Sequence, residues 1–111
     1  LRPEDRGPLW EHLVLNELHA LGFRREIRYW RTKHGREIDF VLRRRGGNVL
    51  AIECKWSASA FEADHLLAFR RSYPRGDKLV VAADVTTPFT RRYEDVPVRF
   101  LGVGSLPEAL R

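Results

Sequence analysis

Glu37-Ile-Asp-Phe-Val-Leu42 and Asn48-Val-Leu-Ala-Ile-Glu-Cys-Lys55, joined by a short basic turn with Gly46-Gly47, form the stretch that decides the fold. Apolar and polar residues alternate at period two in both halves, and β-branched and aromatic types occupy the apolar positions. This pattern predicts two strands. The turn is short enough to close an antiparallel hairpin between them.

The alternation also assigns side chains to the two faces of the hairpin. One face is predicted to carry Glu37, Asp39, Val41, Ala51, Glu53 and Lys55, and the other face to carry Ile38, Phe40, Leu42, Leu50, Ile52 and Cys54. If Val41 pairs with Ala51, the same register sets Asp39 beside Glu53 and Glu37 beside Lys55. The sequence therefore predicts three acids and one lysine in a single patch.

Two interpretations of this patch are open. Facing carboxylates repel each other and lose hydration when partly buried, so a fold that builds them gains from a bound cation, and oxygen ligands suit Mg²⁺ or Mn²⁺. Alternatively, the face is the solvated side of an ordinary sheet, with a weak ion pair between Glu37 and Lys55. Val41 and Ala51 continue the charged face as apolar, which indicates a covered side and favours the cation site.

The totals indicate a single globular domain. The chain has 111 residues, of which 43% are hydrophobic, and no apolar run approaches membrane-spanning length. It starts at Leu1 and contains no methionine, so we expect a piece of a longer polypeptide, with residues 1–6 as a linker remnant and 7–111 as the domain. The single cysteine, Cys54, is expected to be a small buried hydrophobe, and a cytoplasmic location follows.

The net charge of +5 favours polyanionic partners, nucleic acid above all. Basic residues cluster in two predicted turns, and the contacts expected with a DNA backbone come from Arg31, Lys33, Arg36, Arg43, Arg44 and Arg45. Such contacts position a duplex without identifying its bases. DNA is therefore the expected partner, and no membrane is expected.

The remaining elements are predicted from the spacing of apolar residues and from the residue types that begin and end helices. We expect helices over about 9–21 and 60–72, strands over 25–31, 78–83 and 98–103, a loop over 84–97, and a short last helix capped by Ser105 and Glu108. The predicted class is α/β, with a mixed central sheet of about five strands flanked by helices.

The first helix carries two glutamates on or beside its apolar stripe. If the helix packs on the charged side of the hairpin, Glu11 adds another carboxylate to the patch, although a first-turn acid also complements the helix dipole. Glu17 either joins the site or is a structural acid bonded to Arg31 or to a backbone amide.

The sequence lacks the residues that several other kinds of site require. The four histidines do not fall at metal-ligand spacings with Cys54, so zinc is not expected. No phosphate-binding loop of the Gly-x-x-x-x-Gly-Lys type is present, so no nucleotide is expected in this chain. A glycosidase would need a sugar-sized cleft, and a lysine beside the acid fits a phosphate better.

Gly7-x-x-x-Glu11, Arg36-Glu37-Ile38-Asp39-Phe40 and Ile52-Glu53-Cys54-Lys55 together resemble the PD-(D/E)XK nuclease superfamily. The interval from Glu11 to Gly22-Phe23 is similar to archaeal Holliday-junction resolvases. More closely, Gly7 to Leu101 resembles the uncharacterised domain that follows the AAA-type ATPase module in many bacterial and archaeal proteins.

The resemblance implies a restriction-endonuclease-like αβββαβ core and a Mg²⁺- or Mn²⁺-dependent deoxyribonuclease for structured or branched DNA, attached to an AAA-type ATPase. Glu11, Asp39 and Glu53 match the metal-binding acids, and Lys55 matches the catalytic lysine. Glu37 departs from the resolvase pattern, and it could alter the metal site or pair with Lys55. An alternative is a nuclease-fold domain without activity that binds DNA or a protein and regulates the ATPase, and a homodimer is compatible with both.

Overall fold

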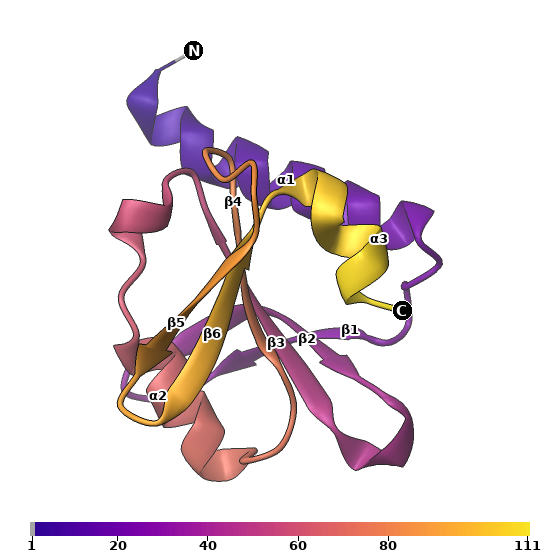
Figure 1. The fold of residues 1–111 in the computed structure, drawn as a ribbon, viewed down its shortest axis with the longest axis vertical. Coiled ribbons are helices and arrows are strands. Elements are labelled where there is room, and N and C mark those ends of the chain that lie inside the picture. The colour runs from indigo at the N-terminus through magenta and orange to yellow at the C-terminus, as the bar shows by residue number, and fades with distance from the viewer. Residues whose placement is uncertain (1) are drawn as a thin grey trace.

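A mixed six-stranded sheet with the strand order β1-β2-β3-β4-β6-β5 forms the centre of the molecule (Figure 1). The computed structural model describes residues 2–111, except for the side chain of Arg45. Its elements are α1 (Pro3–Ala20), β1 (Ile27–Arg31), β2 (Glu37–Arg43), β3 (Val49–Lys55), α2 (Asp64–Ser72), β4 (Lys78–Ala82), β5 (Phe89–Tyr93), β6 (Val96–Leu101) and α3 (Leu106–Ala109). Short 3₁₀ turns cover Arg45–Gly47, Ala58–Ala60 and Val103–Ser105.

Strands β1, β2 and β3 form the predicted antiparallel meander. Helix α2 then returns the chain across one face, so that β4 runs parallel to β3. Strand β6 pairs in parallel with β4, and β5 closes the far edge antiparallel to β6. The predicted α/β class with a mixed sheet is confirmed, with six strands in place of about five.

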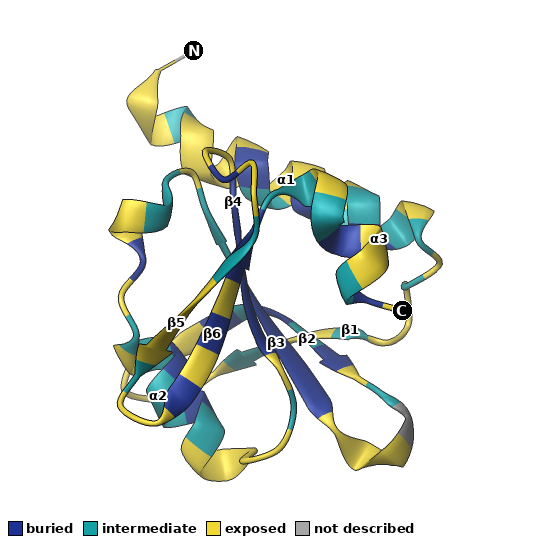
Figure 2. Cartoon of the chain, viewed as in Figure 1, coloured by how far each residue is buried: buried dark blue, intermediate teal, exposed yellow. Residues whose placement is uncertain are grey.

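Each face of the sheet has its own hydrophobic cluster. Figure 2 shows that the central strands β3 and β4 are buried along most of their length. Helices α1 and α3 cover the face that includes Phe40, Leu50 and Ile52. Helix α2 covers the opposite face, which includes Val41 and Ala51. The inference that Val41 and Ala51 belong to a covered side is confirmed. The expectation that the first helix would cover that side is wrong, because α1 packs on the other face.

The hairpin has the predicted register. Val41 pairs with Ala51, Phe40 with Ile52 and Leu42 with Leu50. Gly46 and Gly47 both adopt φ of 83° in the turn, a conformation that side chains with a Cβ rarely take. The turn therefore sets the register that places the acids of the two strands side by side.

A β-bulge in β2 departs from simple alternation. Arg28 pairs with Val41 and Trp30 with Ile38, so Tyr29 alone lies opposite both Asp39 and Phe40. The extra residue reverses the side of the sheet on which the residues before the bulge lie. Ile38 therefore packs in the α2 cluster, whereas Phe40 packs in the α1 cluster. The predicted placement of Ile38 with Phe40 on one face is therefore wrong.

Helix α1 begins six residues earlier than predicted, at Pro3 rather than Leu9. Proline is well accommodated in a first helical turn, where its missing N–H needs no partner. Residues 3–6 are therefore helical, although they contribute nothing to the core.

The buried stripe of α1 is narrower than predicted. It consists of Trp10, Val14 and Leu18, whereas Leu9 and Leu13 are 50% and 42% exposed. The Trp10 indole N–H donates a hydrogen bond of 2.9 Å to the carbonyl of Val81 in β4. That buried bond fixes α1 against the centre of the sheet.

Three further details differ from the prediction. Helix α2 begins at Asp64 rather than near Ala60, after the 3₁₀ turn. The segment predicted as a loop over 84–97 contains β5, which sequence reasoning missed because this edge strand exposes Arg91 and Arg92. The short last helix is present, but Ser105 makes no side-chain capping hydrogen bond.

Within the described residues, none of the helices combines the length and the hydropathy needed to cross a membrane.

Candidate functional site

The site lies where β2 and β3 separate. Pairing between the two strands ends at Phe40 and Ile52, although β2 begins at Glu37 and β3 continues to Lys55. Beyond this point each strand stays with its other neighbour, since Arg31 pairs with Glu37 and Lys55 pairs with Ala82. The sheet therefore opens into a fork at the predicted acidic patch.

Carboxyl groups replace the missing ladder hydrogen bonds in the fork. The Asp39 N–H donates to Glu53 Oε1 at 3.0 Å, and the Cys54 N–H donates to Asp39 Oδ2 at 2.8 Å. Each acid thus accepts a backbone amide hydrogen bond from the opposite strand. Asp39 and Glu53 lie next to each other, as the register predicts.

His65 of α2 contacts Glu37, the first residue of β2. Its Nδ1 lies 2.9 Å from both the backbone N and the backbone O of Glu37, so either neutral tautomer makes one of the two hydrogen bonds. Nothing in the sequence indicates that the start of α2 reaches the start of β2, so His65 was not predicted to lie in the site. It is the residue that sequence reasoning missed.

The electrostatics of the fork disfavour two negative charges. Glu53 is 6% exposed, and burial, reinforced by repulsion from Asp39, raises its pKa to about 8. Burial also raises the pKa of Asp39, and the Cys54 N–H and the Lys55 ammonium only partly oppose this effect. Without a cation, the pair therefore favours holding a proton over carrying two charges.

Helix α1 brings a third carboxyl to the same region. Partial burial is the main cause of a raised pKa at Glu11, and repulsion from Asp39 and Glu37 adds to it. Cys54, half-buried against the α1 cluster as expected, has its pKa raised by burial and then by Asp39 and Glu11. Glu11 therefore faces the fork although its helix packs on the other side of the sheet from α2.

Two cavities meet at the fork. One, of about 250 Å³, is lined by Glu37, Asp39, Glu53, Lys55, Ala60, Glu62 and His65. The other, of about 340 Å³, is lined by Glu11, Tyr29, Trp30, Arg31, Glu37, Ile38, Asp39 and Phe40. Asp39 and Glu37 line both, so Asp39 is accessible from the α1 side and from the α2 side.

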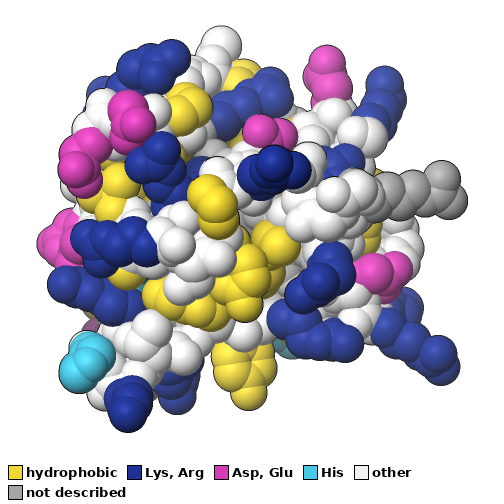
Figure 3. All heavy atoms as spheres, turned by 90° about the horizontal axis from the view of Figure 1, so that it is seen from below, with side chains coloured by type: hydrophobic (Ala, Val, Ile, Leu, Met, Phe, Trp, Pro, Cys, Tyr) yellow, Lys and Arg dark blue, Asp and Glu magenta, His cyan; other side chains and the backbone are white. Residues whose placement is uncertain are grey.

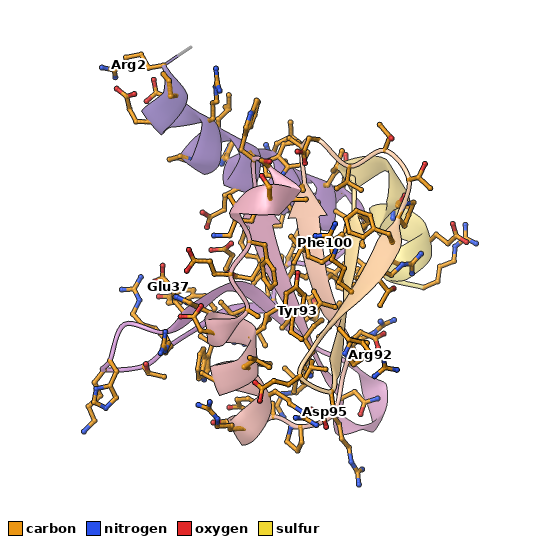
Figure 4. The ribbon with its side chains drawn as sticks, turned by 60° about the vertical axis from the view of Figure 1, so that its left-hand side comes forward. Arg2, Glu37, Arg92, Tyr93, Asp95 and Phe100 are labelled. Carbon is orange, nitrogen blue, oxygen red and sulfur yellow. The ribbon has the colours of Figure 1, made fainter. Side chains whose placement is uncertain are left out.

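Glu37 does not pair with Lys55 as the sequence suggested. Its carboxylate lies 3.2 Å from the guanidinium of Arg31 on β1. Figure 4 shows Glu37 at the margin of the molecule beside α2. Lys55 is half-buried on the wall of the 250 Å³ cavity. Its ammonium is therefore left to the cavity rather than tied to Glu37.

Glu17 does not join this site. It is only half-buried, it lines neither cavity, and Arg31 is paired with Glu37 instead. Its position on α1, nearly two turns beyond Glu11, accounts for the separation. Of the predicted modulators, only Glu37 borders the fork.

The donor set fits a hard divalent cation in its chemistry. Asp39, Glu53 and Glu11 offer oxygen ligands, and burial together with mutual repulsion raises their pKa values, an effect that a bound cation would oppose. Asp39 and Glu53 each commit one oxygen to a backbone amide, which leaves the second oxygen of each without a hydrogen bond from a described residue. In residues 2–111 no group of three His, Cys, Asp or Glu side chains is already arranged to hold a metal ion, so Glu11 would have to approach the pair.

Some of the side chains predicted to contact DNA already bind other groups of the protein. Lys33 and Arg43 are exposed. Arg31 pairs with Glu37, and Arg36 is bonded to Asp64 at the start of α2. Arg44 donates to the carbonyls of Leu110 and Arg111 at 3.1 and 2.8 Å, so it anchors the hairpin turn to the end of the chain. The side chain of Arg45 lies outside the described part.

Comparison with known proteins gives one result. No curated protein matches the chain. A family model described as a domain of unknown function, DUF4143, matches residues 6–101, which run from the first turn of α1 to the end of β6 and include both strands of the fork. The chain therefore belongs to the DUF4143 family.

Proposed function

We propose that this chain is a nuclease domain of the PD-(D/E)XK type that hydrolyses phosphodiester bonds in DNA with Mg²⁺ or Mn²⁺. The observation that carries the proposal is the pair of neighbouring carboxyls, buried Glu53 and half-buried Asp39, at the ends of two separating strands with Lys55 beside them. The element order from α1 to β4 is also that of a restriction-endonuclease-like core, αβββαβ.

The position of each residue indicates its role in the proposed reaction. Asp39, Glu53 and Glu11 would hold the cation, which supplies activation of water and neutralisation of phosphate charge when bound. The Lys55 ammonium, on the same cavity wall, would stabilise the negative charge that develops on the phosphate. Lys33 and Arg43 would hold the DNA backbone. We further propose that the domain acts in the cytoplasm, attached to an AAA-type ATPase.

The direct test is cleavage of plasmid and four-way-junction DNA with Mg²⁺ or Mn²⁺. The wild-type chain should cut, Asp39→Ala and Lys55→Ala should abolish cutting, and Glu108→Gln, an exposed acid on α3, should not change it. Calorimetry should show weaker binding of Mn²⁺ to Glu53→Gln than to the wild type. Cleavage that survives in both Asp39→Ala and Lys55→Ala would refute the assignment.

A second candidate function is a nuclease-fold domain that binds DNA or a protein without cutting and regulates the attached ATPase. Two observations favour it: the described residues contain no ready group of three ligands, and Glu37 places a further negative charge at the fork. Retained DNA binding with no calorimetric signal from Mg²⁺ or Mn²⁺ would select this function over the first.

A further inference from the structure

Tyr29 is the most exposed of the large hydrophobic side chains described, at 76%, and it lies on β1 at an open edge of the sheet. An aromatic ring in this position gains nothing from the core. It offers a flat apolar face to an incoming group, and nucleobases stack on such rings.

The position of Tyr29 relative to the acids is set by the bulge in β2. Tyr29 lies opposite Asp39 and Phe40, one strand away, and neighbouring strands are about 5 Å apart. Tyr29, Glu11 and Asp39 line the same cavity of about 340 Å³. A base stacked on Tyr29 would therefore place its own phosphate near the fork.

The surroundings of Tyr29 are suited to a polyanion. Between 24 and 36 the sequence has six basic residues, Arg24, Arg25, Arg28, Arg31, Lys33 and Arg36, against one acid, Glu26. A second cavity, of about 130 Å³, adjoins the first at Tyr29 and Trp30 and includes Arg28 and Arg43 in its lining. Figure 3 shows a face of the molecule on which Lys and Arg surround a hydrophobic centre. This combination of arginine and aromatic surface is typical of sites for single-stranded nucleic acid.

We propose that Tyr29 stacks on an unpaired base, so that the substrate is DNA with a single-stranded segment that crosses β1 beside the acids. In a duplex the faces of each base are already covered by the neighbouring bases, whereas a single strand or a branch point contains unpaired bases that can stack on a protein ring. The inference rests on the proposed nuclease function for the role of the acids. The stacking itself needs no cleavage.

Binding in EDTA separates the stacking from the chemistry. Fluorescence anisotropy with a labelled single-stranded oligonucleotide should show about tenfold weaker binding for Tyr29→Ala and less than twofold change for Tyr29→Phe, which keeps the ring. A duplex of the same sequence should bind equally to all three proteins. Arg43→Ala should weaken single-strand binding and lower its salt dependence, whereas Arg92→Ala on the distant β5 should not.

A base analogue reports the contact directly. The fluorescence of 2-aminopurine in the oligonucleotide should fall on binding to wild type and to Tyr29→Phe, and remain high with Tyr29→Ala. Equal binding of the single strand by wild type and Tyr29→Ala would overturn the proposal. So would a change of oligomeric state in Tyr29→Ala with unchanged DNA binding, because Tyr29 would then be part of a protein interface.

The two proposals fail in different ways. If Tyr29-dependent binding of single strands occurs but no DNA is cut with Mg²⁺ or Mn²⁺, the nuclease assignment fails and the stacking stands. If duplex plasmid is cut at the same rate by wild type and Tyr29→Ala, and single strands bind both proteins equally, the nuclease stands and the stacking fails.

Discussion

Replacing Glu53 by glutamine should stabilise the metal-free protein at pH 8 and change it little at pH 5. The amide oxygen of glutamine can still accept the hydrogen bond from the Asp39 N–H, while the buried charge is removed. The pKa of Glu53 rises from 4.5 to about 8 in the fold, so the folded state holds a proton that the unfolded state has lost across this range. The wild type should therefore lose stability as the pH rises from about 4.5 to about 8.

The magnitude follows from the width of that window. The interval from pH 5 to pH 8 spans about three pH units of that window. At about 1.36 kcal/mol for each unit, the free energy of unfolding falls by at most about 4 kcal/mol. Water that enters the fork when Glu53 ionises would reduce the cost, so we expect at least about 2 kcal/mol. This is a large fraction of the stability of a small domain.

Urea unfolding in EDTA at pH 5, 6, 7 and 8 measures the effect. The free energy of unfolding of the wild type should fall across the series, whereas that of Glu53→Gln should fall much less. Glu62→Gln removes an exposed acid from the rim of the same cavity and should follow the wild type. If wild type and Glu53→Gln keep a constant difference from pH 5 to pH 8, Glu53 is ionised without cost and the fork has no need of a cation.

Two further predictions concern the scaffold. Gly76→Ala should destabilise by more than about 2 kcal/mol in thermal unfolding, because its Cβ would lie 2.2 Å from the carbonyl oxygen of Val49 at a φ of +115°; Gly104→Ala, with open space around it, is the control, and equal melting temperatures would contradict the prediction. Trp10→Phe should cost about 1–3 kcal/mol in urea unfolding, since the buried carbonyl of Val81 loses its hydrogen bond. An unchanged free energy of unfolding there would mean that water replaces the indole.

The hairpin was predictable because its information is local. The alternation of residue types and the length of the turn together determine the register from Val41 to Ala51, and with it the meeting of Asp39 and Glu53. Edge strand β5 was not predictable in this way, since Arg91 and Arg92 remain in solvent whether or not the strand pairs.

The finer geometry of the site depends on contacts that are remote in the sequence. The bulge at Asp39 and Phe40 arises from the pairing of β2 with β1, and so from residues outside the β2–β3 hairpin. The contact of His65 with Glu37 joins residues 28 positions apart and requires the direction of α2. The sequence therefore indicates which acids belong together, and only the packing of helices decides what surrounds them.

The fork also divides the acids between two pairs of strands. Asp39 belongs to β2, which pairs with β1, while Glu53 belongs to β3, which pairs with β4, and the two halves are joined through the paired residues from Phe40 to Arg43. Across the opening, the only links described between the two strands are the hydrogen bonds that Asp39 and Glu53 themselves accept. Truncation of either acid therefore removes a link between the halves of the sheet as well as a charge.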